Sequence, residues 1–102
     1  MSSLRELHLS KNNLGKNNLI DWQWLLGLQI TKSLKLLDIS GNKIKYLPTA
    51  IWKLINLVTL RVNDNELKKI PATIGRIRTL RYLDISQNNF KSSSKIQTVL
   101  CR

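Results

Sequence analysis

A short pattern of leucines that closes on an asparagine recurs four times along this 102-residue chain. Each copy fits L-x-x-L-x-L-x-x-N-x-L, with Ile, Val or Phe in place of some leucines. The copies read LRELHLSKNNL, LKLLDISGNKI, LVTLRVNDNEL and LRYLDISQNNF, and they begin at Leu4, Leu34, Leu57 and Leu80. Because the asparagine stays in register, we interpret the copies as structural repeats that must stack to bury their apolar positions.

Each position of the pattern predicts a local structure. The x-L-x-L stretch alternates polar and apolar residues, as a half-buried strand does. Stacked copies predict a parallel sheet with these inward pairs: Leu7/Leu9, Leu37/Ile39, Leu60/Val62 and Leu83/Ile85. Asparagine carries both a donor and an acceptor, which suits a sharp turn with buried backbone groups. The pattern therefore predicts a ladder of Asn12, Asn42, Asn65 and Asn88 where the strands end.

The two middle repeats also share a second half, YLPTAIWKLIN from Tyr46 and KIPATIGRIRT from Lys69. Proline suits the first turn of a short helix. Apolar residues three positions apart then face inward, which predicts core positions at Ile51/Leu54 and at Ile74/Ile77.

On these residues the chain resembles the leucine-rich repeat family, in its 23-residue LPxxI subtype. The resemblance implies an α/β fold, a curved solenoid with short parallel strands on the concave face and short helices or turns on the convex face. It covers nearly the whole chain, so we expect one domain over 1–102 with repeats at about 4–33, 34–56, 57–79 and 80–102. Neither end shows a polar cap, so we expect an excerpt of a longer protein.

Two repeats depart from the pattern. The first is 30 residues long where the next two are 23, and we expect a longer convex helix within 15–33. The fourth lacks the Leu-Pro step, which predicts a degenerate repeat or a terminating turn at Ser92, Ser93 and Ser94. Three tryptophans lie in return segments, where we expect them to pack in the core: Trp22, Trp24 and Trp52.

Composition bounds the class of protein. Lys and Arg total 17 against 6 Asp and Glu, a net charge of +11. The sequence has no run of 18 apolar residues and no leader typical of secretion. The one cysteine, Cys101, excludes an internal disulfide, and no N-x-[ST] motif occurs. We expect an intracellular protein of the cytoplasm or nucleus.

No catalytic constellation is visible, and we expect no enzyme, no cofactor and no metal. His8 is the single histidine, and the spacings typical of metal ligands are absent. Asp38 and Asp84 occupy equivalent positions two repeats apart, about 10 Å by strand spacing, without an acid–base environment. Cys101 is interpreted as a buried apolar residue of the final turn.

The side chains between the core leucines line the expected concave face. An aromatic residue, an outward leucine and mixed charges there favour a protein or peptide ligand. The candidate contact residues are Leu36, Tyr82, Arg61, Asp38, Asp84 and His8. Two alternatives stay open: Arg61 neutralises the aspartates of the neighbouring strands, and Leu36 packs beneath a flanking segment.

A second reading uses the net charge. A convex basic ridge would bind nucleic acid or anionic lipid through Lys68, Lys69, Arg76, Arg78 and Arg81. Solvation of these charges is the simpler interpretation. In a third reading the repeats are only a spacer between other domains.

One further resemblance bears on function. The run TKSLKLLDISGNKIKYLP from Thr31, followed by NDNEL and IPATIG, is similar to the repeats of substrate receptors of cullin-RING ubiquitin ligases. It implies that the concave face holds a protein substrate. Such receptors join their ligase through an elongin-binding box outside the repeats, and no segment of this sequence matches that box.

Overall fold

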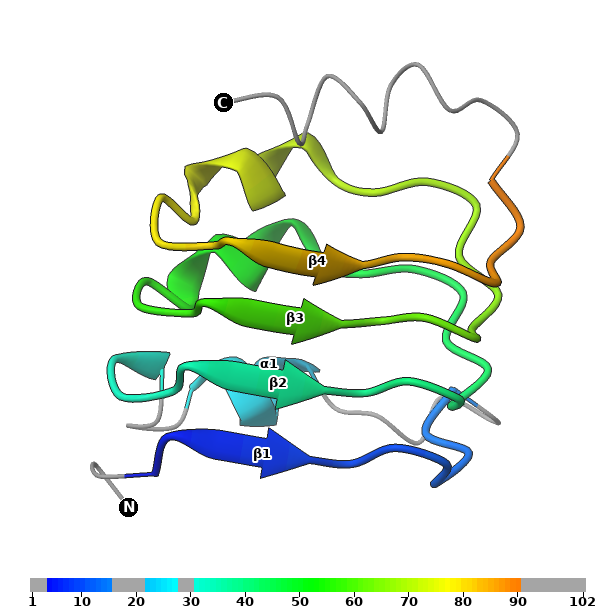
Figure 1. The fold of residues 1–102 in the computed structure, drawn as a ribbon, viewed down its shortest axis with the longest axis horizontal. Coiled ribbons are helices and arrows are strands. Elements are labelled where there is room, and N and C mark those ends of the chain that lie inside the picture. The colour runs from blue at the N-terminus through cyan, green and yellow to red at the C-terminus, as the bar shows by residue number, and fades with distance from the viewer. Residues whose placement is uncertain (1–3, 16–21, 28–30, 91–102) are drawn as a thin grey trace.

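The computed structural model describes residues 4–15, 22–27 and 31–90 of the chain (Figure 1). The strands of this part follow one another in one parallel sheet: β1 (Glu6–His8), β2 (Leu36–Asp38), β3 (Thr59–Arg61) and β4 (Tyr82–Asp84). Three helical segments lie behind the sheet in this view: α1 (Trp22–Leu26), η3 (Thr49–Lys53) and η4 (Ala72–Arg76). The result is a two-layer α/β stack of repeats, with the sheet in one layer and the helical segments in the other.

The strand register is the alignment that the repeats predict. Leu37 of β2 pairs with Leu7 of β1 and with Leu60 of β3, and Leu83 of β4 continues this row. A slip of one residue would turn every inward leucine to the opposite face, so the alternating pattern strongly specifies this register. The outward residues consequently form two rows: Glu6–Leu36–Thr59–Tyr82 and His8–Asp38–Arg61–Asp84.

The core lies between the sheet and the helical layer. Its centre is formed by the two middle repeats, in which the inward strand residues and the predicted helix pairs are almost fully buried: Leu37, Ile39, Leu60, Val62, Ile51, Leu54, Ile74 and Ile77. The inward residues of the outer strands are only partly buried: Leu7, Leu9, Leu83 and Ile85. A repeat buries its apolar face against both neighbours, so an outer repeat with one described neighbour stays half covered.

The predicted asparagine ladder is present. The Asn42 side chain donates to the carbonyl oxygens of Ile39 in its own repeat (2.9 Å) and Leu9 in the preceding one (2.8 Å). Its Oδ1 accepts from the backbone N–H groups of Asn12 (2.6 Å) and Leu14 (3.3 Å). Asn42, Asn65 and Asn88 each bond backbone groups of two repeats in this way, which ties the turns together, whereas the Asn12 side chain donates only within its own repeat, to Leu9 and Ser10.

The residue before each ladder asparagine has a positive φ: Lys11 (58°), Gly41 (67°), Asp64 (58°) and Gln87 (57°). This left-handed conformation costs a residue with a side chain roughly 1–2 kcal/mol. Stacking offsets the cost, because the N–H of Lys11 donates to the Ser40 carbonyl (2.9 Å) and that of Asp64 to the Ser86 carbonyl (2.9 Å). The turn is therefore imposed by its neighbours, and glycine is not required at this position.

An α-helix does form in the overlong first repeat, and its described part, α1, spans five residues, as do the 3-10 helices η3 and η4. The longer helix expected within 15–33 falls partly outside the described residues. Pro48 and Pro71 begin η3 and η4 as N-caps, with φ of −72° and −64°. The expected turn at residues 92–94, the Trp24 side chain and Cys101 lie outside the described residues.

Gly15 and Gly75 provide a matched pair of substitutions. A Cβ on Gly15 would overlap the Lys43 carbonyl oxygen and lie 2.8 Å from the Ile44 Cα, whereas a Cβ on Gly75 in η4 meets no heavy atom within 4 Å. We expect Gly15→Ala to lower the free energy of unfolding by about 1–3 kcal/mol, because backbone must move. Gly75→Ala should raise it by about 0.4–1 kcal/mol. Urea unfolding of both variants tests this; equal effects would contradict the close approach.

Candidate functional site

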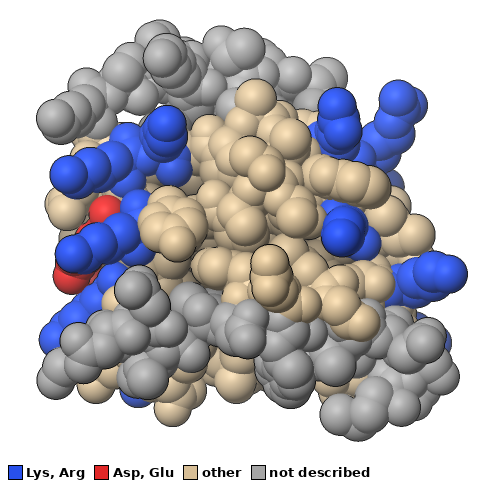
Figure 2. Space-filling view, turned by 180° about the vertical axis from the view of Figure 1, so that it is seen from behind, with Lys and Arg blue, Asp and Glu red and all other residues tan. Residues whose placement is uncertain are grey.

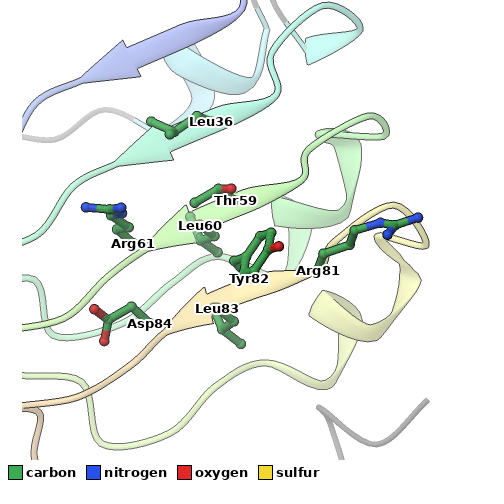
Figure 3. A pocket seen from close by; sticks show the side chains of 8 residues that line it. All are labelled: Leu36, Thr59, Leu60, Arg61, Arg81, Tyr82, Leu83 and Asp84. Atoms are coloured by element: carbon green, nitrogen blue, oxygen red, sulfur yellow. The ribbon is translucent and has the colours of Figure 1, made fainter.

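The candidate site lies on the face of the sheet that points away from the helical layer. We name it the open sheet face and define it by the outward side chains of the four strands: Glu6, His8, Leu36, Asp38, Thr59, Arg61, Tyr82 and Asp84. A hollow of about 780 Å³ opens on it over β2, β3 and β4. Figure 3 shows its lining: Leu36, Thr59, Leu60, Arg61, Arg81, Tyr82, Leu83 and Asp84.

An apolar row crosses this hollow. Leu36, Thr59 and Tyr82 occupy one register row on three successive strands. Tyr82 is 67% exposed, and Leu36 and Thr59 are partly buried. Leu36 lines the hollow among described residues, so its side chain is open to a ligand there. An aromatic side chain this exposed on a sheet contributes little to the core and offers a large, stiff contact surface.

The two aspartates close the turns that follow their strands. Asp38 Oδ1 accepts from the Ser40 N–H (3.0 Å) and hydroxyl (2.7 Å). Asp84 Oδ1 accepts in the same way from the Ser86 N–H (3.1 Å) and hydroxyl (2.7 Å). These local bonds are typical of aspartate at turns. Both residues therefore have a structural role in addition to the contact role predicted for them.

Arg61 lies between these aspartates in the register but forms no ion pair with them. Within the described residues, the one charged pair closer than 4.0 Å joins His8 Nε2 and Glu6 Oε1, at 3.1 Å. The Asp38 and Asp84 carboxylates are engaged with Ser40 and Ser86. Direct neutralisation of Arg61 across the sheet, an alternative that the sequence left open, is therefore not observed.

The hollow brings together only part of the predicted set. Leu36, Arg61, Tyr82 and Asp84 line it, whereas His8 and Asp38 do not. His8 lies on β1 at the end of the described sheet, where its exposed side chain pairs with Glu6.

Four lining residues were not among the predicted contacts: the inward leucines Leu60 and Leu83, together with Thr59 and Arg81. Thr59 lines the hollow between Leu36 and Tyr82. Arg81 was placed on the convex basic ridge, but it lines the hollow at the start of β4 (Figure 3). The sequence feature that could have indicated this location is that Arg81 directly precedes Tyr82, an outward residue of the strand. In Figure 3, Arg81 and Arg61 extend toward opposite ends of the strands, with Tyr82 between them.

The helical side shows where the other cations lie. Figure 2 shows Lys and Arg gathered toward two sides of this face, with a strip free of them between. Lys68 and Lys69 precede η4 in the chain, and Arg78 follows it. Arg81 lines the hollow on the open sheet face, whereas Arg76 belongs to η4 in the helical layer, so the predicted ridge is not confined to the helical side.

The tryptophan expectation holds for one of the two described side chains. Trp22 packs against the core, as expected. Trp52 is 37% exposed, and the Arg76 guanidinium lies 6.0 Å from its ring centroid, within the range of a cation–π contact. Ile51 and Leu54 fill the inward positions of this turn, which leaves Trp52 on its outer side.

The described residues include no group of three His, Cys, Asp or Glu side chains that would hold a metal ion. Every buried side-chain nitrogen or oxygen in this part has a hydrogen-bond partner, so none is left pointing at a ligand. Among these residues, none of the helices has the length and apolar character that a membrane span requires.

Comparison with known families agrees with this architecture. A Leucine Rich Repeat model matches residues 33–54 and 79–101, and a second Leucine Rich repeat model matches residues 1–17. Together these matches cover more than half of the chain, and the chain belongs to the leucine-rich repeat proteins. No curated protein matches it. Domains of this family generally mediate protein–protein interaction and are typically non-catalytic.

Proposed function

We propose that this domain is a non-catalytic protein-recognition module that binds a protein or peptide on its open sheet face. The single observation that carries the proposal is the exposed Tyr82 side chain in a hollow that it shares with Leu36 and Arg61. Protein interfaces centre on aromatic and arginine anchors of this kind inside a polar rim. The curved solenoid, with this face concave, is part of the proposal.

The finer proposal concerns the cellular role. The run from Thr31 to Pro48 is similar in sequence to leucine-rich repeat protein 1, a substrate receptor of cullin-RING ubiquitin ligases. We propose that the open sheet face holds a protein substrate in such a role, inside the cytoplasm or nucleus. The single cysteine and the lack of N-x-[ST] motifs support an intracellular setting.

Tyr82 and Tyr46 offer a matched test, because they are 67% and 62% exposed and only Tyr82 lies on the open sheet face. We expect Tyr82→Ala to weaken binding of a captured partner about 30-fold or more, as a hot-spot truncation does. Tyr46→Ala should leave affinity unchanged. Affinity capture from lysate, followed by titration of the captured protein, measures both. Equal losses in the two variants would contradict recognition on this face.

The electropositive reading remains a second candidate, supported by the net charge of +11 and by the groups of cations in Figure 2. Salt separates the two. Binding through several phosphate contacts falls steeply between about 0.1 M and 0.4 M salt. Binding anchored by Tyr82 and Leu36 should fall far less, because apolar contacts are not screened. If the captured ligand is lost at the higher salt, and Tyr82→Ala captures it as well as the wild type does, the result would favour nucleic acid or anionic lipid.

A further inference from the structure

We propose that the open sheet face selects an acidic partner: an extended peptide segment whose Asp or Glu side chain pairs with Arg61 while a neighbouring apolar side chain packs on Tyr82 and Leu36. This inference rests on the proposed function and specifies the chemistry of its ligand. Three features of the hollow support it: a guanidinium with no carboxylate partner among the described residues, an excess of positive charge in the lining, and the spacing between the guanidinium and the row of Leu36, Thr59 and Tyr82.

The first feature is the state of Arg61. It is exposed in β3, and its guanidinium has no carboxylate within 4.0 Å among the described residues. The two carboxylates that flank it in the register each have one oxygen in a local bond: Asp38 Oδ1 accepts from Ser40, and Asp84 Oδ1 accepts from Ser86. The five N–H donors of an arginine are arranged in a rigid fork that fits a carboxylate with two parallel bonds. Arg61 is therefore available for such a pair with a ligand.

The second feature is the charge around the hollow. Its lining contains Arg61, Arg81 and one carboxylate, that of Asp84. Glu6 pairs with His8 on β1, away from the hollow. The chain as a whole carries +11, and a field of one sign attracts ligands of the other sign over distances beyond direct contact. The lining of the hollow and the whole chain are thus both net positive, which favours an acidic ligand over a basic one, although Asp38 flanks Arg61 on β2.

The third feature is spacing. Thr59 belongs to the apolar row with Leu36 and Tyr82, and Arg61 follows it by two residues in β3. Two residues of extended chain span about 6.6 Å, and alternate side chains of an extended chain point to the same side. A peptide running along the strands would therefore place an acidic and an apolar residue, two positions apart, over Arg61 and over the apolar row.

A random-peptide library displayed on phage tests this ligand chemistry directly. The wild-type domain should enrich peptides with Asp or Glu two positions from an aromatic or aliphatic residue. Arg61→Glu should replace that acidic preference with Lys or Arg at the same position. Arg78→Glu is the matched control, because Arg78 is exposed, does not line the hollow and changes the net charge equally. It should enrich the wild-type motif.

Titration of one selected peptide then measures how much the pair between Arg61 and its acidic residue contributes to affinity. Changing its acidic residue to the corresponding amide should weaken binding to the wild type about tenfold or more, since a bidentate ion pair is lost. The same change should have little effect on Arg61→Gln, in which the guanidinium is already absent. Arg61→Glu adds a negative charge between Asp38 and Asp84 and is therefore expected to destabilise the fold. Arg61→Gln adds no charge, so it tests the contact even where Arg61→Glu does not fold. Circular dichroism melting establishes that each variant is folded.

The possible results separate this inference from the proposed function. Peptides that retain the acidic preference on Arg61→Glu, or that bind the Arg61→Gln variant as tightly as wild type, would overturn the role of Arg61. Peptides that lose binding on Tyr82→Ala but show no acidic preference would overturn the inference and leave the proposed function standing. If the selected peptides bind Tyr82→Ala as tightly as the wild type, or if the library yields no binder, the result would contradict both the inference and the proposed function.

Discussion

Replacing Asn65 with alanine is expected to lower the free energy of unfolding by about 3–5 kcal/mol, a large part of the stability of a domain of this size. Asn65 Oδ1 accepts from the backbone N–H groups of Asn42 (2.9 Å) and Ile44 (3.0 Å). Its amide donates to the carbonyl oxygens of Ile39 (3.2 Å), Val62 (2.9 Å) and Asn63 (3.2 Å). Alanine leaves two buried N–H groups without a partner, and each costs about 1–3 kcal/mol.

Two further variants show whether hydrogen bonding causes the loss. Asn65→Asp keeps the shape but turns the donating amide into an acceptor that faces three carbonyl oxygens, so it should destabilise at least as much as alanine. Asn56→Ala removes one exposed bond, to the Lys32 carbonyl at 2.6 Å, and should cost about 0.5–1.5 kcal/mol. Urea unfolding of the three variants measures these differences. A loss below that of Asn56→Ala would show that water replaces the Asn65 side chain.

Leu37→Ala is expected to lower the free energy of unfolding by about 3–5 kcal/mol, because it opens a cavity in the core. Leu37 is fully buried in β2 and lies between Leu7 and Leu60 in the register. The preceding residue, Leu36, is also a leucine but faces the opposite side of the sheet and is only partly buried. The same substitution there should cost less than about 1 kcal/mol.

This pair links stability to recognition. Leu36→Ala should reduce binding at the open sheet face while unfolding stays close to wild type, because Leu36 lines the hollow. Thermal and urea unfolding of Leu36→Ala and Leu37→Ala, with titration of one bound peptide, provides both measurements. Similar losses of stability in the two variants would contradict the alternation of faces in β2.

Much of the fold was predictable because the repeat uses local rules. Inward leucines follow from the period of two, and the ladder asparagines follow from their fixed distance to those leucines. The helix pairs Ile51/Leu54 and Ile74/Ile77 were predicted from spacing alone, and all four side chains are buried. The exposed position of Trp52 was predicted less well. Helix ends and residues beside a core position depend on packing, which a short pattern does not encode.

The candidate site was predictable only as two rows of outward residues. Which of them meet in one hollow depends on the neighbours that each strand brings, from residues 23 positions away in the chain. Arg81 joined the site and His8 fell outside it for this reason. The sequence likewise did not predict whether Arg61 pairs with the neighbouring aspartates. That depends on how the side chains of Asp38 and Asp84 are oriented, and each of them bonds to a serine in its own turn.

The sequence by itself determined the repeat, the strand register, the inward face and the asparagine ladder, because each depends on residue type at a fixed spacing within one repeat or the next. Only the tertiary structure decided which outward side chains gather around Tyr82, and that Arg61 forms no ion pair within the part of the chain that the structure describes. The physical reason is that burial restricts which residue types occupy the inward positions, whereas solvent-facing positions accept most residue types. Their neighbours and hydrogen bonds follow from how the repeats stack, and these contacts define what the open sheet face can bind.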